Sequence, residues 1–113
     1  MRNDIPIIQK VYDFYREFYL NLPGMPKYDR HTIGLKMQNI CLELLENLLS
    51  ASRTNKQNKA EFLSKAAIKL DLLKTLLQLS EDIKALPTKR YLFLSEKLQE
   101  VGRMLGGWIK SLN

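Results

Sequence analysis

Residues 30–50 read RHTIGLKMQNICLELLENLLS, and the spacing of their apolar side chains decides the fold. Apolar residues recur here every three or four positions, which places them on one face of a helix. This face consists of Ile33, Met37, Ile40, Cys41, Leu44 and Leu48, and is widened by Leu42, Leu45 and Leu49. The pattern predicts an amphipathic helix over residues 30–50, with Cys41 as a small core side chain instead of a reactive thiol.

Three breaks divide the rest of the chain. The segment Pro23-Gly24-Met25-Pro26 precedes this helix, the polar run over residues 53–58 follows it, and Leu86-Pro87 comes later. We therefore expect four helices, at about residues 5–22, 30–50, 59–85 and 88–112. Asp4, Asp29 and Thr88 are possible N-caps of three of them. Short connections between amphipathic helices predict an all-α, antiparallel up-down four-helix bundle, in one domain over residues 1–113.

The first and last helices each carry one apolar face at the same spacing. In the first helix this face consists of Ile8, Val11, Tyr12, Tyr15, Phe18, Tyr19 and Leu22. In the last helix it consists of Tyr91, Leu94, Leu98, Val101, Leu105, Trp108, Ile109 and Leu112. Both faces are expected to point into the core.

The third helix is apolar on two sides. Its core face consists of Phe62, Leu63, Ala66, Leu70, Leu73 and Leu77. A second group lies well away from that face at about 100° per residue, and it consists of Ile68, Leu72, Leu76 and Leu79. This group is either an interface between subunits, which predicts a homo-oligomer, or the edge of a single wide core face.

Glycines interrupt the fourth helix. Gly102 and Gly106 are four residues apart, and Gly107 follows them. A mid-helix glycine costs roughly 1 kcal/mol relative to alanine, so we expect these residues to permit close approach of another backbone. The alternative is that the helix breaks near Gly106, but the apolar face continues through Trp108 and favours an unbroken helix.

Composition argues against most active-site chemistry. The chain has 113 residues with one Cys and one His, so a disulfide scaffold, a cysteine zinc site and a multi-histidine site are excluded. There is no glycine-rich phosphate loop, and His31 is expected to be exposed or to cap a helix. We expect no catalytic residue, no cofactor and no metal. No signal peptide or membrane-spanning segment is apparent, so we expect a cytoplasmic protein without a membrane partner.

The positive charge is uneven. Residues 1–50 carry six basic and six acidic side chains, whereas residues 51–113 carry twelve basic and six acidic ones, which accounts for the net charge of +6. A basic half predicts a polyanionic partner, and the alternative is a basic solubilising surface. Basic residues cluster over 53–69, and Arg103 and Lys110 form a strip on the last helix. Phe62 lies on the core face, so backbone phosphate contacts are expected instead of base stacking.

Two segments resemble one known family. PKYDRHTIGLK over residues 26–36 and EVGRMLGGWIK over residues 100–110 look like the signatures of the accessory variability determinant (Avd) proteins of diversity-generating retroelements. Met25 stands where that family often has an aromatic residue. The resemblance implies a non-catalytic partner of the element's reverse transcriptase during mutagenic retrohoming. It also implies a homopentameric barrel that binds RNA and DNA with little sequence preference.

The resemblance also points to site residues. The basic positions that it carries over are Arg30, Lys36, Arg103 and Lys110, and its packing positions are Gly102, Gly106 and Trp108. Charge density adds Lys65, Lys69, Arg90 and Lys97 to the expected nucleic-acid contacts. The alternatives are the related four-helix-bundle protein of rRNA intervening sequences, a small enzyme with a polar bundle core, and a purely structural oligomer.

Overall fold

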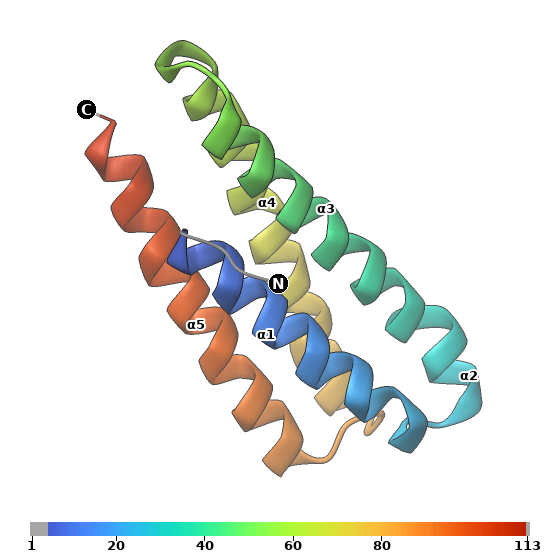
Figure 1. Cartoon of the computed structure of the whole chain (residues 1–113). Coiled ribbons are helices and arrows are strands. Elements are labelled where there is room, and N and C mark those ends of the chain that lie inside the picture. Colours follow the sequence, from blue (N-terminus) through green and yellow to red (C-terminus); the bar gives the residue numbers. More distant parts are fainter. Residues whose placement is uncertain (1–4, 113) are drawn as a thin grey trace.

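The computed structural model describes residues 5–112, and four long helices pack antiparallel in it (Figure 1). The first is α1 (Pro6–Asn21), followed by the short 3₁₀ turn η1 (Leu22–Gly24). The second is a continuous run of α2 (Lys27–Asp29), the π-helical turn η2 (Arg30–Gly34) and α3 (Leu35–Arg53). The third and fourth are α4 (Lys56–Asp82) and α5 (Thr88–Ser111). The predicted all-α four-helix bundle is confirmed.

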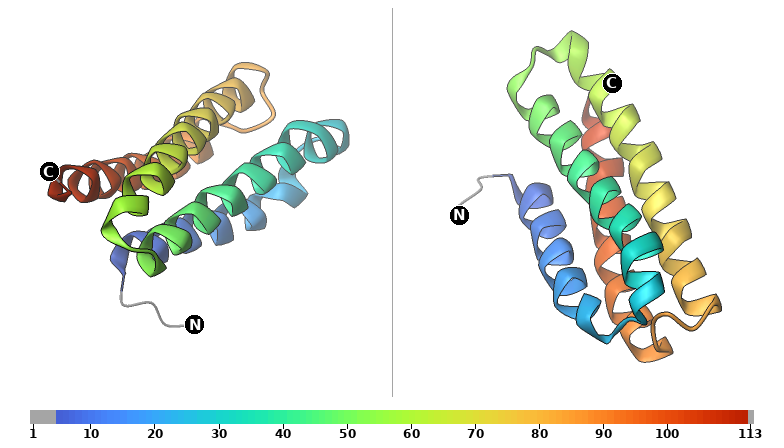
Figure 2. Two further views of the ribbon diagram at one scale, coloured as in Figure 1. Left: turned by 90° about the horizontal axis from the view of Figure 1, so that it is seen from above. Right: turned by 90° about the vertical axis from the view of Figure 1, so that its right-hand side faces the viewer.

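The helices form a closed ring of neighbours around one core. Consecutive helices pack against each other, most extensively α3 against α4, and α1 also packs against α5. Figure 2 shows the bundle from two further sides, with the α3–α4 connection and the end of α5 at the same end. With 16 residues, α1 is much shorter than α4 with its 27.

Helix starts differ from the expected caps. Asp29 and Thr88 are inside their helices, which begin after Pro26 and Pro87, so neither residue is an N-cap. A proline that precedes the first turn restricts the backbone to an extended conformation and starts the helix without a capping side chain. The cap of α4 is Asn55, whose side chain accepts a hydrogen bond of 3.0 Å from the amide of Asn58, so α4 begins at Lys56. Asp4 lies outside the described residues.

The apolar face of α1 is rotated from the expected one. Ile7 and Phe14 are buried, with Phe14 fully enclosed, whereas Tyr12 and Tyr19 are exposed. Both sets fit the helical period, because the apolar arc of α1 is wider than one core face. A tyrosine hydroxyl prefers contact with water, so the all-carbon rings take the interior. The prediction for Tyr12 and Tyr19 was wrong.

The other core faces agree with the prediction, with two exceptions. On α3, Leu42 is 47% exposed and points away from the core that it was expected to widen. The predicted core residues of α4 and α5 are buried, or partly buried and packed against the core, except that Ile109 at the end of α5 is exposed. Cys41 is buried among them as expected, and desolvation raises the pKa of its thiol to about 12.

The turn between α1 and α2 depends on a different glycine from those expected to matter. Leu22 and Met25 are buried and fold back onto the π-helical turn. A Cβ atom on Gly34 would lie 3.2 Å from the side chain of Leu22 and 3.2 Å from the carbonyl oxygen of Asp29. Gly34 therefore allows the connection to pack closely, with Met25 filling the adjacent space.

The end of α4 is closed by a left-handed residue. Lys84 has φ = 64°, and the amides of Lys84 and Ala85 donate to the carbonyls of Glu81 and Ser80. These two bonds are the Schellman arrangement that satisfies the last carbonyls of a helix. The position usually holds glycine, because a left-handed backbone costs other residues roughly 1–2 kcal/mol.

Removing the Phe14 ring tests the rotated face of α1. We expect Phe14→Ala to lower the free energy of unfolding by about 3–5 kcal/mol, because it leaves a cavity in a closed core. Tyr19→Ala should change it by no more than about 0.5 kcal/mol. Urea denaturation at equal protein concentration measures both. Equal losses in the two variants would show that α1 is not oriented as described.

A second substitution tests the cap of α4. Lys84→Gly should raise the free energy of unfolding by about 0.5–1 kcal/mol, because the relieved strain exceeds the added chain entropy. Lys89→Gly is the matched control, since it places a glycine inside the first turn of α5 and should destabilise the protein. Urea denaturation of the two variants compares them. A destabilised Lys84→Gly protein would contradict the left-handed conformation.

Candidate nucleic-acid interface

The eight predicted nucleic-acid residues do not form one patch. They lie on η2, α3, α4 and α5, and most of them have an acidic neighbour or a partly buried side chain. Lys65 lies 3.5 Å from Glu61 on the same helix, and Lys69 lies 3.1 Å from Glu43 across the α3–α4 contact. These pairs neutralise the two lysines, so the α3–α4 side has little surplus positive charge.

The first motif contributes little exposed basic surface. Arg30 is partly buried in the π-helical turn, and its Nε atom is buried without a hydrogen-bond partner among the described residues. Lys36 is exposed on α3, in a shallow hollow that Glu43 and Glu46 also line. Neither residue therefore adds to a continuous basic surface.

Three of the predicted residues gather along the side of α5 that faces α1. Arg103 pairs with Glu100 one turn earlier. Arg90 and Lys97 both lie against the ring of Phe93, with the Arg90 Cζ atom 5.3 Å and the Lys97 Nζ atom 4.8 Å from its centroid. Phe62 was the aromatic residue considered among the basic residues of the sequence, whereas in the structure Phe93 lies under two of the predicted basic residues.

Four basic side chains without an ion pair lie at one end of the bundle, where α3 turns into α4 and α5 ends (Figure 1). The last turn of α5 lies beside the first turns of α4, since Ala60, Ser64, Ile109 and Leu112 line one hollow. We call four residues there the basic end: Arg53, Lys56, Lys59 and Lys110. No carboxylate among residues 5–112 lies within 4.0 Å of their charged groups. Glu61 is the sole acid over residues 47–70, and it faces Lys65.

Three of these four residues were not among the predicted site residues, although they belong to the basic cluster over 53–69. The sequence itself shows how they differ from Lys65, because the spacing to the nearest acid is different. Lys65 follows Glu61 by four residues and Arg103 follows Glu100 by three, which is the spacing of ion pairs on a helix. Lys56, Lys59 and Lys110 have no acid three or four residues away in either direction.

The predicted oligomer contacts are partly exposed, as an interface would require. Ile68, Leu72 and Leu79 are exposed, by 65%, 38% and 42%, and only Leu76 packs against the core. The alternative of one wide core face is therefore wrong for three of the four residues. The structure holds one chain and leaves the interface a prediction.

The helix glycines make no close backbone contact within the chain. No atom lies within 4 Å of a Cβ placed on Gly106 or Gly107, and the nearest atom to one on Gly102 is the flexible end of Lys74. The expected close approach of another backbone is therefore absent within the described chain and stays a prediction for contacts between subunits. The helix does continue to Ser111, and Trp108 packs partly buried against the core.

The described residues give little support for a metal site or a membrane-spanning helix. Residues 5–112 contain no group of three or more His, Cys, Asp or Glu side chains placed to hold a metal ion. Burial also raises the pKa of the Tyr15 hydroxyl, with smaller contributions from Cys41 and Tyr19. None of the helices over the described residues is long and apolar enough to span a membrane.

Comparison with known proteins gives the family. No match was found among curated proteins. A family model described as bAvd-like matches residues 5–112, which include both signature segments and all four long helices. Because the match covers nearly the whole chain, the protein belongs to the bAvd-like family of bacterial accessory variability determinant proteins.

Proposed function

We propose that the protein is a non-catalytic accessory factor of a diversity-generating retroelement, which binds nucleic acid through the basic end and associates with the element's reverse transcriptase. Family membership supports the accessory role. Nucleic-acid binding is supported by one observation in particular. Four basic residues lie together without acidic partners among the described residues: Arg53, Lys56, Lys59 and Lys110. The family match also favours this role over that of an rRNA intervening-sequence protein.

The basic end suits a phosphate backbone. Lysine and arginine side chains that neutralise phosphates release condensed counterions, and this release drives binding without reading sequence. Paired lysines such as Lys65 must first leave a carboxylate, so they contribute less to such binding. RNA and DNA of any sequence are therefore the expected ligands, with affinity that falls steeply as salt rises.

We also propose that the subunit assembles into a homopentameric ring, as its family resemblance implies. The exposed apolar side chains of α4 support an association surface, because exposed apolar patches on a subunit usually mark an interface. Ile83 extends this patch beyond Leu79 toward the end of α4. The patch lies on α4 and its C-terminal cap, between residues 68 and 83, whereas the basic end includes the first turn at the other end of that helix. Assembly through α4 would therefore leave the basic end of each subunit open to nucleic acid.

Neutralising the basic end tests the nucleic-acid proposal. The fourfold variant Arg53→Gln, Lys56→Gln, Lys59→Gln and Lys110→Gln should bind RNA and DNA at least about tenfold more weakly in low salt. The slope of log affinity against log salt should fall by about 0.7–0.9 for each phosphate that is no longer neutralised. Fluorescence anisotropy over a salt series measures both quantities.

A second variant with the same change in net charge is the control. Lys36→Gln, Lys65→Gln, Lys69→Gln and Arg103→Gln removes four positive charges that have acidic neighbours. It should retain most of the affinity. Equal losses in the two variants would mean that only net charge matters, and unchanged binding in the first variant would overturn the assigned site.

The association surface has its own test. Ile68→Glu with Leu72→Glu should reduce the particle from larger than a dimer to a smaller species, measured by sedimentation equilibrium at micromolar concentration. Leu20→Glu is the control, because Leu20 on α1 is as exposed as Ile68, at 64% against 65%. A wild-type monomer, or an unchanged oligomer in the double variant, would contradict assembly through α4.

A further inference from the structure

We propose that Phe93, with Arg90 and Lys97 beside it, is a stacking site for an unpaired nucleobase, so that the protein holds single-stranded nucleic acid along α5. The inference rests on the proposed nucleic-acid function and deepens it. It adds a contact that a duplex cannot make, because the bases of a duplex already stack on one another.

Phe93 is a partly exposed phenylalanine with two cations over its ring. It is 38% exposed, and the two cations are Arg90 from three residues before it and Lys97 from four residues after it, so a base that stacks on the ring displaces the Lys97 ammonium from it. Single-strand binding sites combine aromatic rings, on which bases stack, with positive groups that contact the phosphates. Arg90, Phe93 and Lys97 bring these two kinds of group together on one helix.

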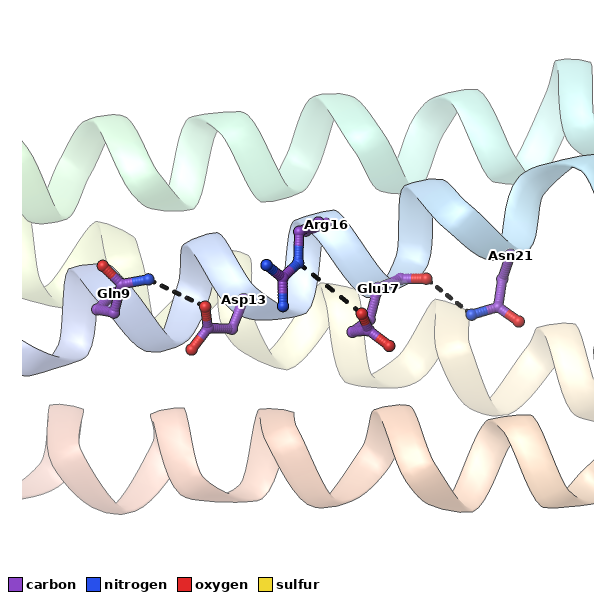
Figure 3. Close-up of polar contacts among 5 residues, drawn as sticks. All are labelled: Gln9, Asp13, Arg16, Glu17 and Asn21. Carbon is purple, nitrogen blue, oxygen red and sulfur yellow. Dashed lines mark hydrogen bonds and ion pairs between the residues drawn. The ribbon is translucent and has the colours of Figure 1, made fainter. Parts of the chain in front are cut away.

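The arginine of this cluster is held in place from the neighbouring helix. Arg90 Nε donates a hydrogen bond of 2.7 Å to Asn21 Oδ1 on α1. Asn21 in turn donates through Nδ2 to the carbonyl oxygen of Glu17, at 2.7 Å. Figure 3 shows Asn21 and Glu17 in the row of polar side chains along α1. A side chain that is already ordered loses less entropy when it meets a ligand.

Phe93 lines a groove between α1 and α5. The groove has a volume of about 390 Å³, and Lys10, Lys97 and Arg103 line it together with Asp13, Glu96 and Glu100. Glu100 pairs with Arg103, whereas Asp13 accepts a hydrogen bond of 3.0 Å from the uncharged amide of Gln9. Lys10 and Lys97 form no ion pair among residues 5–112, so they remain available to phosphates beside a stacked base.

The groove and the basic end are connected by α5. Seventeen residues separate Phe93 from Lys110, which corresponds to about 26 Å along a helix. A strand of several nucleotides that stacks one base on Phe93 therefore reaches the basic end with its phosphates. The duplex has no free base for the ring and is expected to use the basic end alone.

The test compares three DNA ligands: a 12-nucleotide single strand, the same strand with abasic residues throughout, and a duplex of equal length. Phe93→Leu keeps the apolar bulk and should bind the single strand at least about fivefold more weakly, because stacking contributes about 1–3 kcal/mol per base. Its binding to the abasic strand and to the duplex should not change. Phe93→Trp should bind the single strand at least as tightly as the wild type.

The control is Phe62→Leu, which removes a ring that also has a lysine nearby, at 5.7 Å, but that packs against the core on α4. This variant should keep the wild-type ratio between the affinity for the normal single strand and the affinity for the abasic strand. If Phe93→Leu weakened binding of all three ligands equally, or weakened none of them, the stacking site would be overturned. In that case, salt-dependent binding of the duplex would still support the proposed function. Absence of binding by the wild type to any ligand would overturn both.

Discussion

Burial of one apolar face from each of four helices in a common core is the constraint on which the rest of this structure depends. The contact between α3 and α4 is its largest part, and it encloses Met37, Leu44, Leu73 and Leu77 completely or almost completely. Once these faces are inside, every charged residue of the long helices must lie outside. The surface chemistry is therefore decided by which charges the antiparallel packing places beside one another.

Helix packing pairs some basic side chains along the helices with acids and leaves four at one end without a carboxylate partner among the described residues. Lys69 meets Glu43 across the α3–α4 contact, and Lys65 and Arg103 meet acids on their own helices. The α3–α4 connection has no facing helix to supply a carboxylate, and its own sequence is rich in lysine. Four of the twelve basic residues over positions 51–113 therefore lie at this end without a carboxylate partner among the described residues. A polyanion would meet this end before the paired sides of the bundle.

Much of the fold follows from the sequence, because helical periodicity and the breaks at proline and polar residues are local signals. The core face of α3 could be predicted for this reason. The choice between Phe14 and Tyr19 could not, since both fit the period and only packing against α3 and α5 decides between them. The importance of Gly34 was equally hidden, because it depends on Leu22 folding back from the preceding turn. In the candidate site, Phe93 could not be singled out from the sequence, because the groove that it lines is formed only when α5 packs against α1.

The central claim is that nucleic acid binds the basic end, and lysine footprinting tests it most directly. The protein is modified with an amine-reactive reagent, with and without bound RNA, and the modified lysines are measured by mass spectrometry. The account predicts that RNA protects Lys56, Lys59 and Lys110, while Lys36 and Lys65 remain as reactive as in the free protein. Protection of Lys36 and Lys65 with Lys56, Lys59 and Lys110 still reactive would contradict it.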